Sequence, residues 1–193
     1  MSYLAFRDLT KNEIEVRIGT QNKSGLTLLL YKNARVDMDI LDETVGAENW
    51  QREHYECKGN LFCRVGIKTK PTVDMKPNGI ELDGNAWVWK SDCGTESNTE
   101  KEKGEASDSF KRACVNWGIG RELYTAPFIR IPAAADDGTA NYMLDDKGKC
   151  RDKFVVQKII IENKRITALA VYNMKLKKTV YIWQAPQKKS EQA

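Results

Sequence analysis

The segment from Gly104 to Leu123 constrains the fold more than any other part of the chain. At 100° per residue its apolar positions fall on one stripe, and glycines follow the last of them, where helices commonly end. The stripe consists of Ala106, Phe110, Ala113, Cys114 and Trp117, and Gly118 and Gly120 come after it. Because such a stripe needs a core to cover it, the pattern predicts a packed helix over about residues 98–117.

The same helix carries two adjacent cations, Lys111 and Arg112. Lys111 falls on the flank of the stripe and Arg112 on the opposite side, so both can face solvent. Two neighbouring cations on a rigid helix can hold a phosphate backbone. The alternative is an ordinary solvated helix with an Asp108–Arg112 pair at i, i+4, which stabilises a helix only slightly. Composition alone favours the solvated helix.

The remaining periodicities predict an α+β protein. Ala34, Met38, Leu41 and Val45 recur at helical spacing before Gly46, while Leu61, Cys63, Val65 and Ile67 alternate with more polar residues, as in a half-buried strand. The expected helices lie at 5–17, 33–46 and 98–117, and the expected strands at 26–31, 50–57, 60–69, 84–90, 154–161, 166–172 and 179–183. Lys58-Gly59 is the expected hairpin turn, Ser97–Glu100 a capping box, and 125–152 a loop region.

Bulk properties permit a nucleic-acid partner without requiring one. The chain has 193 residues, 41% of them hydrophobic, with a formal net charge of +4. We therefore expect one medium-sized domain, or one domain with an appendage, with a mildly basic surface. No apolar run approaches the roughly 20 residues of a membrane span. The N-terminal stretch lacks the features of a signal peptide. We therefore expect a cytoplasmic protein with no membrane partner.

Signatures of catalysis, cofactors and metals are weak. His54, Cys57 and Cys63 have a spacing that matches no common zinc site, so reduced thiols are favoured over a metal centre. No Gly-x4-Gly-Lys-Ser/Thr phosphate loop is present, which argues against ATP-driven chemistry. The acidic run Asp37–Glu43 resembles half of a nuclease metal site, but no second carboxylate cluster has diagnostic spacing. The prediction is a protein that is not an enzyme and has no cofactor and no metal.

Two segments resemble the Rad52 superfamily of single-strand DNA annealing proteins, nearest to its phage (Sak-like) branch. One is YKNARVDMDILDETVGAENW, Tyr31 to Trp50, in which an arginine opens a helix that ends in glycine before an Asn-Trp pair. The other is EKGEASDSFKRACVNWGIGRELY, Glu102 to Tyr124, with its Ser-Asp-x-x-Lys-Arg-Ala core. The similarity covers about residues 26–130.

This resemblance implies a β-β-β-α core, in which a three-stranded antiparallel meander packs on a long helix, followed by a C-terminal β-meander. It also implies rings with single-stranded DNA in a positively charged groove. Together with the composition of the chain, it leads us to expect an annealing core at 1–130, a β-rich extension at 131–184 and a polar tail at 185–193. We interpret Trp87 and Trp89 as a second apolar side of the sheet, covered by a ring neighbour or by the C-terminal meander of the same chain.

In the family, the groove includes the helix-opening arginine and the Lys-Arg pair, which match Arg35, Lys111 and Arg112 here. The chain departs from eukaryotic members at Val115, where they carry another arginine, and at Glu96 and Glu100, where they carry lysines. The groove is therefore expected to take cations from elsewhere. The nearest candidates are Lys101, Lys103, Lys68, Lys90 and Arg121.

The expected function is ATP-independent binding and annealing of single-stranded DNA in recombination and repair, in a phage-encoded protein. The expected partners are single-stranded DNA and other copies of the chain, with a phage exonuclease or a host single-strand-binding protein as further candidates. Two alternatives remain open. One is a binding module that protects single strands without annealing them, and the other is a metal-dependent nuclease built on the run Asp37–Glu43.

Overall fold

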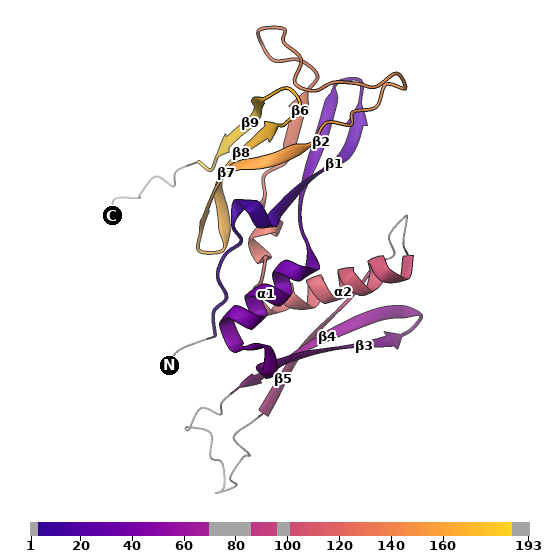
Figure 1. The fold of residues 1–193 in the computed structure, drawn as a ribbon, viewed down its shortest axis with the longest axis vertical. Coiled ribbons are helices and arrows are strands. Elements are labelled where there is room, and N and C mark those ends of the chain that lie inside the picture. The colour runs from indigo at the N-terminus through magenta and orange to yellow at the C-terminus, as the bar shows by residue number, and fades with distance from the viewer. Residues whose placement is uncertain (1–3, 70–85, 96–100, 187–193) are drawn as a thin grey trace, which may run out of the picture. The chain divides into compact units, whose positions relative to one another are not determined.

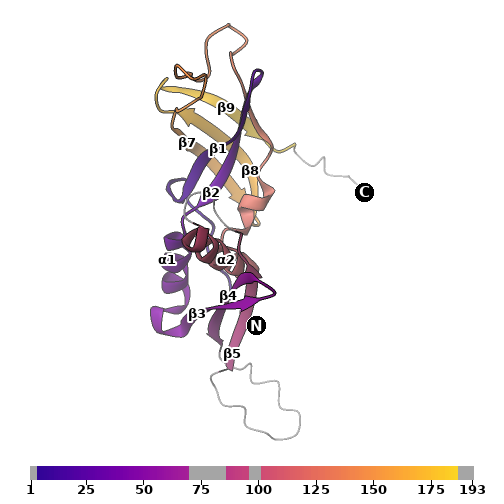
Figure 2. The same cartoon turned by 90° about the vertical axis from the view of Figure 1, so that its right-hand side faces the viewer.

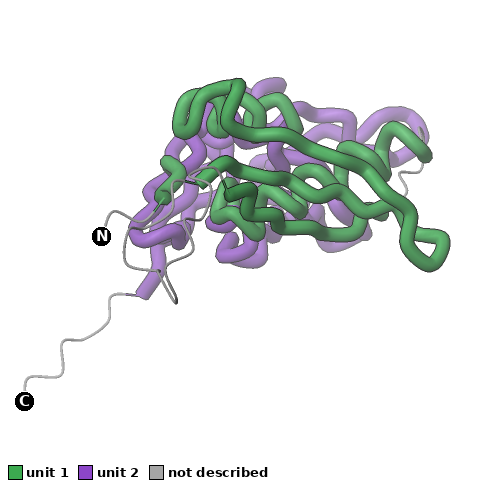
Figure 3. Tube along the Cα trace, turned by 90° about the horizontal axis from the view of Figure 1, so that it is seen from below, with its two compact units in different colours: residues 1–7, 34–120 green, residues 8–33, 121–193 purple. Residues whose placement is uncertain are grey.

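The computed structural model describes residues 4–69, 86–95 and 101–186, which form two compact units (Figure 3). The first unit takes its described residues from 1–7 and 34–120, and the second from 8–33 and 121–193. Helices and antiparallel sheets occur together, so the predicted α+β class is confirmed. No helix within the described ranges is long and apolar enough to cross a membrane.

The first unit contains helices and a three-stranded antiparallel sheet of order β3-β4-β5 (Figure 1). Strands β3 and β4 pair from Trp50↔Ile67 to Cys57↔Asn60. The turn residues Lys58 and Gly59 both have positive φ, 53° and 74°, as the tight hairpin turn requires. The predicted hairpin is therefore confirmed. The elements in order are α1 Ala34–Val45, η2 Ala47–Asn49, β3 Trp50–Cys57, β4 Asn60–Thr69, β5 Ala86–Cys93 and α2 Lys101–Trp117.

The core of this unit lies between one face of the sheet and the helices. Helix α2 runs along β4 and β5, with α1 packed beside it, as Figure 2 also shows. Strand β4 buries Cys63, Val65 and Ile67 toward α2, and α2 buries Phe110 and Cys114. The predicted helical stripe is thus the packed face. Ala106 and Trp117, at its edges, are half-buried. The predicted start of α2 and its capping box, at 97–100, lie outside the described residues, as do 84 and 85.

The second unit is built on a six-stranded antiparallel sheet of order β6-β2-β1-β7-β8-β9. Its three C-terminal strands are confirmed close to their predicted positions. Leu26, Leu28, Ile131, Leu169 and Val171 are fully or almost fully buried and form part of its core. The elements are η1 Lys11–Glu13, β1 Ile14–Asn22, β2 Gly25–Lys32, η3 Arg121–Thr125, β6 Ile129–Pro132, β7 Phe154–Glu162, β8 Arg165–Asn173 and β9 Lys178–Gln184.

Two predictions about local structure were wrong in this unit. The helix predicted at 5–17 is absent: the chain makes only the short 3-10 turn η1 and then enters β1. Ile14, Val16 and Ile18 alternate with charged residues and are β-branched, so they suit a strand paired with β2. The predicted loop at 125–152 contains β6, which pairs with β2 over only four residues. A strand this short leaves little periodicity to detect.

The compact units are defined by packing within the chain, whereas the predicted segments are functional ones. Strands β1 and β2 precede the first unit's helices in the chain but belong to the same sheet as β7, β8 and β9. The functional division into 1–130, 131–184 and 185–193 stays a prediction.

Candidate nucleic-acid interface

The Lys-Arg pair of α2 lies at the surface of the first unit, and each cation is held by a carboxylate. Lys111 Nζ is 4.0 Å from Asp108 Oδ1 on the same helix, and Arg112 Nε donates to Asp92 Oδ1 on β5 at 3.2 Å. The side chains of Lys111 and Arg112 are 23% and 42% exposed. Part-exposed ion pairs of this kind contribute only about 0–1 kcal/mol to stability.

The other predicted cations of the helices are more exposed than Lys111 and Arg112. Arg35 is the second residue of α1, and Lys101 and Lys103 lie in the first turn of α2. Arg121 is exposed too, but it belongs to η3 in the second unit. In the first unit, the packing of α1 against α2 brings together the two helices that carry Arg35 and the Lys111-Arg112 pair.

Lys90 has a structural role in the fold. Its Nζ donates to the backbone carbonyl of Asn116 at 2.9 Å and lies 4.5 Å from the centre of the Trp117 ring. A lysine ammonium group placed beside the last turn of a helix donates to a terminal backbone carbonyl, and the negative end of the helix dipole stabilises its positive charge. Lys90 therefore ties β5 to the end of α2. A contact between Lys90 and DNA stays a prediction, as do the DNA contacts of the other candidate cations.

Lys68 is half-buried and lies opposite Trp87 in the β4–β5 register, on the face of the sheet turned away from α2. Arg64 lies on the same face, with its guanidinium carbon 4.6 Å from the centre of the Trp89 ring. Arg64 was not among the cations predicted from the sequence. The period-two alternation of β4, which puts Arg64 and Lys68 on one side, was the available signal.

The acidic run of α1 serves the fold in several ways. Asp37 is fully buried, and Asp42 Oδ1 accepts a 2.6 Å hydrogen bond from Trp50 Nε1. Glu43 forms a 2.6 Å ion pair with Arg7 Nε. Across the part of the chain that the structure describes, no three or more His, Cys, Asp or Glu side chains are grouped as metal ligands. Within those residues, no assembled group of metal ligands supports the alternative of a metal-dependent nuclease.

His54 and its neighbouring cysteines do not converge. His54 Nε2 donates to the Ala106 carbonyl on α2 at 3.1 Å. Cys63, its cross-strand partner, is fully buried, and burial raises the pKa of its thiol to about 11. Cys57 is exposed and, three residues after His54 on a strand, points to the other face. Cys63 is therefore an unreactive core thiol.

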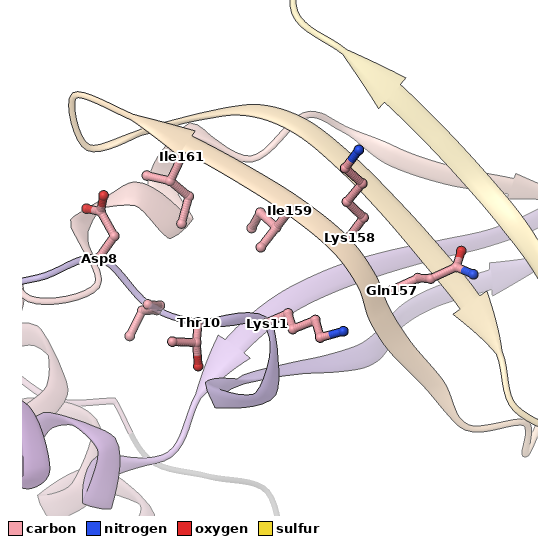
Figure 4. Close-up of a pocket in the computed structure, with 8 residues that line it drawn as sticks. Asp8, Thr10, Lys11, Gln157, Lys158, Ile159 and Ile161 are labelled. Carbon is pink, nitrogen blue, oxygen red and sulfur yellow. The ribbon is translucent and has the colours of Figure 1, made fainter.

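A pocket in the second unit lies between the segment Asp8–Lys11 and β7 (Figure 4). Ile159 and Ile161 give it an apolar wall, and Lys11 and Lys158 give it cationic edges. Its carboxylate, Asp8, is ion-paired with Lys164 at 3.0 Å. The pocket thus combines apolar and basic groups around one neutralised acid.

Comparison with known proteins points to one family. A family model described as the Rad52/22 family double-strand break repair protein matches residues 4–139. No curated protein and no solved structure matches the chain. The matched range contains every predicted cation, from Arg35 to Arg121, and ends before β7, β8 and β9.

Proposed function

The chain belongs to the Rad52/22 family of double-strand break repair proteins, and on that premise we propose that it binds single-stranded DNA and anneals complementary strands without ATP. The observation that carries the proposal is that one family model spans both the α1 arginine, Arg35, and the surface pair on α2, Lys111 and Arg112. Motif wording further supports a place in the phage (Sak-like) branch, and with it a role in phage recombination.

Binding and annealing single strands requires phosphate contacts from this surface but no catalytic group. Cations that contact phosphates release counterions from the DNA, which supplies affinity for any sequence. An annealing protein must not read base edges, because it has to accept every complementary pair. A backbone held in position lowers the entropic cost of bringing two strands together. Since base pairing itself releases free energy, no nucleotide hydrolysis is needed.

We further propose that copies of the chain assemble into a ring in which β3, β4, β5 and α2 form the repeated annealing core. Among the described residues, β3 and β5 lie at the two edges of the three-stranded sheet, and edge strands favour association with another chain. Repeating the α2 cations from copy to copy would align them into one continuous groove.

The test is the salt dependence of binding to a labelled dT oligonucleotide by Lys111→Ala and Arg112→Ala variants. Each substitution is expected to weaken binding to all sequences alike and to reduce the slope of log K against log salt by up to about 0.7. Lys147→Ala, an exposed lysine in a loop of the second unit, is the matched control and should change neither. Unchanged affinity and slope in folded variants would refute the assignment.

Annealing is separated from simple protection by mixing complementary oligonucleotides. An annealing protein accelerates duplex formation, and the Lys111→Ala and Arg112→Ala variants should lose that acceleration in parallel with binding. If the wild-type protein binds single strands with the expected salt slope but does not accelerate pairing, it is a protective binding module.

A further inference from the structure

The face of the β3–β4–β5 sheet turned away from α2 can be identified from the contacts of β3. Trp50 and Arg52 contact the Phe110 ring, with ring centroids 6.1 Å apart and the guanidinium carbon at 4.8 Å, so the even-numbered residues of β3 face the helix. The odd-numbered residues point the other way. Cross-strand register extends this outer face to β4 and β5. Its rings and cations are Tyr55, Phe62, Arg64, Lys68, Trp87 and Trp89.

The rings of the outer face form two pairs, each with one exposed member. Tyr55 stacks on Phe62 with centroids 5.5 Å apart and an interplanar angle of 22°, and Tyr55 is 37% exposed. Trp87 lies 6.1 Å from Trp89 at 31°, and Trp87 is 36% exposed. Because each exposed ring is supported by a neighbour, little side-chain freedom remains to be lost when a ligand stacks on it.

Gly66 explains how the second pair is held against the sheet. A Cβ atom at this position would lie 2.8 Å from ring atoms of Trp89, so the indole packs where only a glycine leaves room. The guanidinium of Arg64 lies over the same ring at 4.6 Å and is fixed by a 2.6 Å ion pair with Glu53. Backbone, cation and ring thus order Trp89, which in turn supports Trp87.

The charges on this face favour a polyanion over a second copy of the chain. Among the described residues of the three strands, two cations, Arg64 and Lys68, share the face with one carboxylate, Glu53, which is ion-paired with Arg64. Two copies meeting through this face would bring like charges together. Single-stranded DNA instead offers phosphates to the cations and flat bases to the rings, the combination typical of sequence-tolerant single-strand binding.

We propose that this outer face is a base-stacking platform for single-stranded DNA, separate from the phosphate contacts of α2. The proposal rests on the proposed function, since it assumes the same ligand. From Phe62 to Lys68 the strand advances about 20 Å at roughly 3.3 Å per residue, about six nucleotides at the 3.4 Å spacing of a stacked strand. Stacking engages the flat face of a base and leaves its pairing edge open to a complementary strand.

The test compares a dT oligonucleotide with an abasic oligonucleotide of the same length and charge. Wild-type protein should bind dT more tightly, because only dT has bases to stack. Trp87→Leu and Tyr55→Leu should each weaken dT binding by roughly 5- to 150-fold, leaving abasic binding and the salt slope unchanged. Trp87→Phe, which keeps a ring, should retain most of the affinity. Tyr124→Leu, at an exposed tyrosine of η3 in the second unit, is the matched control.

Each other outcome has a distinct meaning. Equal binding of dT and abasic strands by the wild type would overturn the platform, even if the Lys111 and Arg112 variants still supported the proposed function. A Trp87→Leu protein with a lower mass by light scattering and an unchanged preference for dT would overturn it too, and would assign the face to contacts between copies. A third result would retain the platform and reject the α2 groove. In it, the wild type prefers dT over the abasic strand, while the Lys111→Ala and Arg112→Ala variants keep the wild-type salt slope.

Discussion

Replacing Phe110 by alanine should strongly destabilise the first unit. Phe110 is fully buried, its ring stacks on Trp50, and the guanidinium of Arg52 lies over it at 4.8 Å. Removing roughly 100–150 Å² of buried apolar surface at about 25 cal/mol per Å² costs about 2.5–4 kcal/mol. The cavity left between α2 and the sheet adds to this, so the expected loss is about 3–5 kcal/mol.

Urea denaturation followed by tryptophan fluorescence measures this loss, because Trp50, Trp87, Trp89 and Trp117 all lie in the first unit. The matched control is Phe128→Ala, the same chemical change at a side chain that is 74% exposed, with an expected effect within about 0.5 kcal/mol. A Phe110→Ala protein of normal stability that failed only in DNA binding would show that Phe110 contacts DNA and is not a packing residue.

Two further predictions concern packing and protonation. Gly94→Ala should destabilise the first unit by about 1–3 kcal/mol in the same urea assay, because a Cβ atom there would lie 2.3 Å from the backbone oxygen of Glu105 on α2. A neutral effect would mean that the backbone just after β5 is not in close contact with α2. Burial raises the pKa of the Cys63 thiol from 9.0 to about 11, so the unfolded chain loses this proton first as pH rises. The free energy of unfolding should therefore fall between about pH 9 and 11. In a Cys63→Ala variant, the free energy of unfolding should fall less steeply over the same range.

The elements that could be predicted from the sequence are those whose patterns are long or contain diagnostic turns. The α2 stripe around Phe110 spans several turns, and Lys58-Gly59 separates two alternating runs, so both were assigned correctly. Residues 5–17 are too short and too mixed in character for a pattern to decide. Their strand β1 exists because β2 pairs with it, and its sheet is completed by β7, which lies more than a hundred residues later in the chain.

The cations of the candidate interface were chosen from residue type and from the family resemblance. The sequence could not predict which side chains they contact in the fold. It determined that Lys111 and Arg112 would lie off the apolar stripe, because helical periodicity is a local property. Only the tertiary structure decided that Arg112 meets Asp92, that Lys90 caps α2, and that Arg64 lies over Trp89 above Gly66. Such contacts depend on strand register and on helix-to-sheet packing, which join residues far apart in the chain and leave no periodic trace in it.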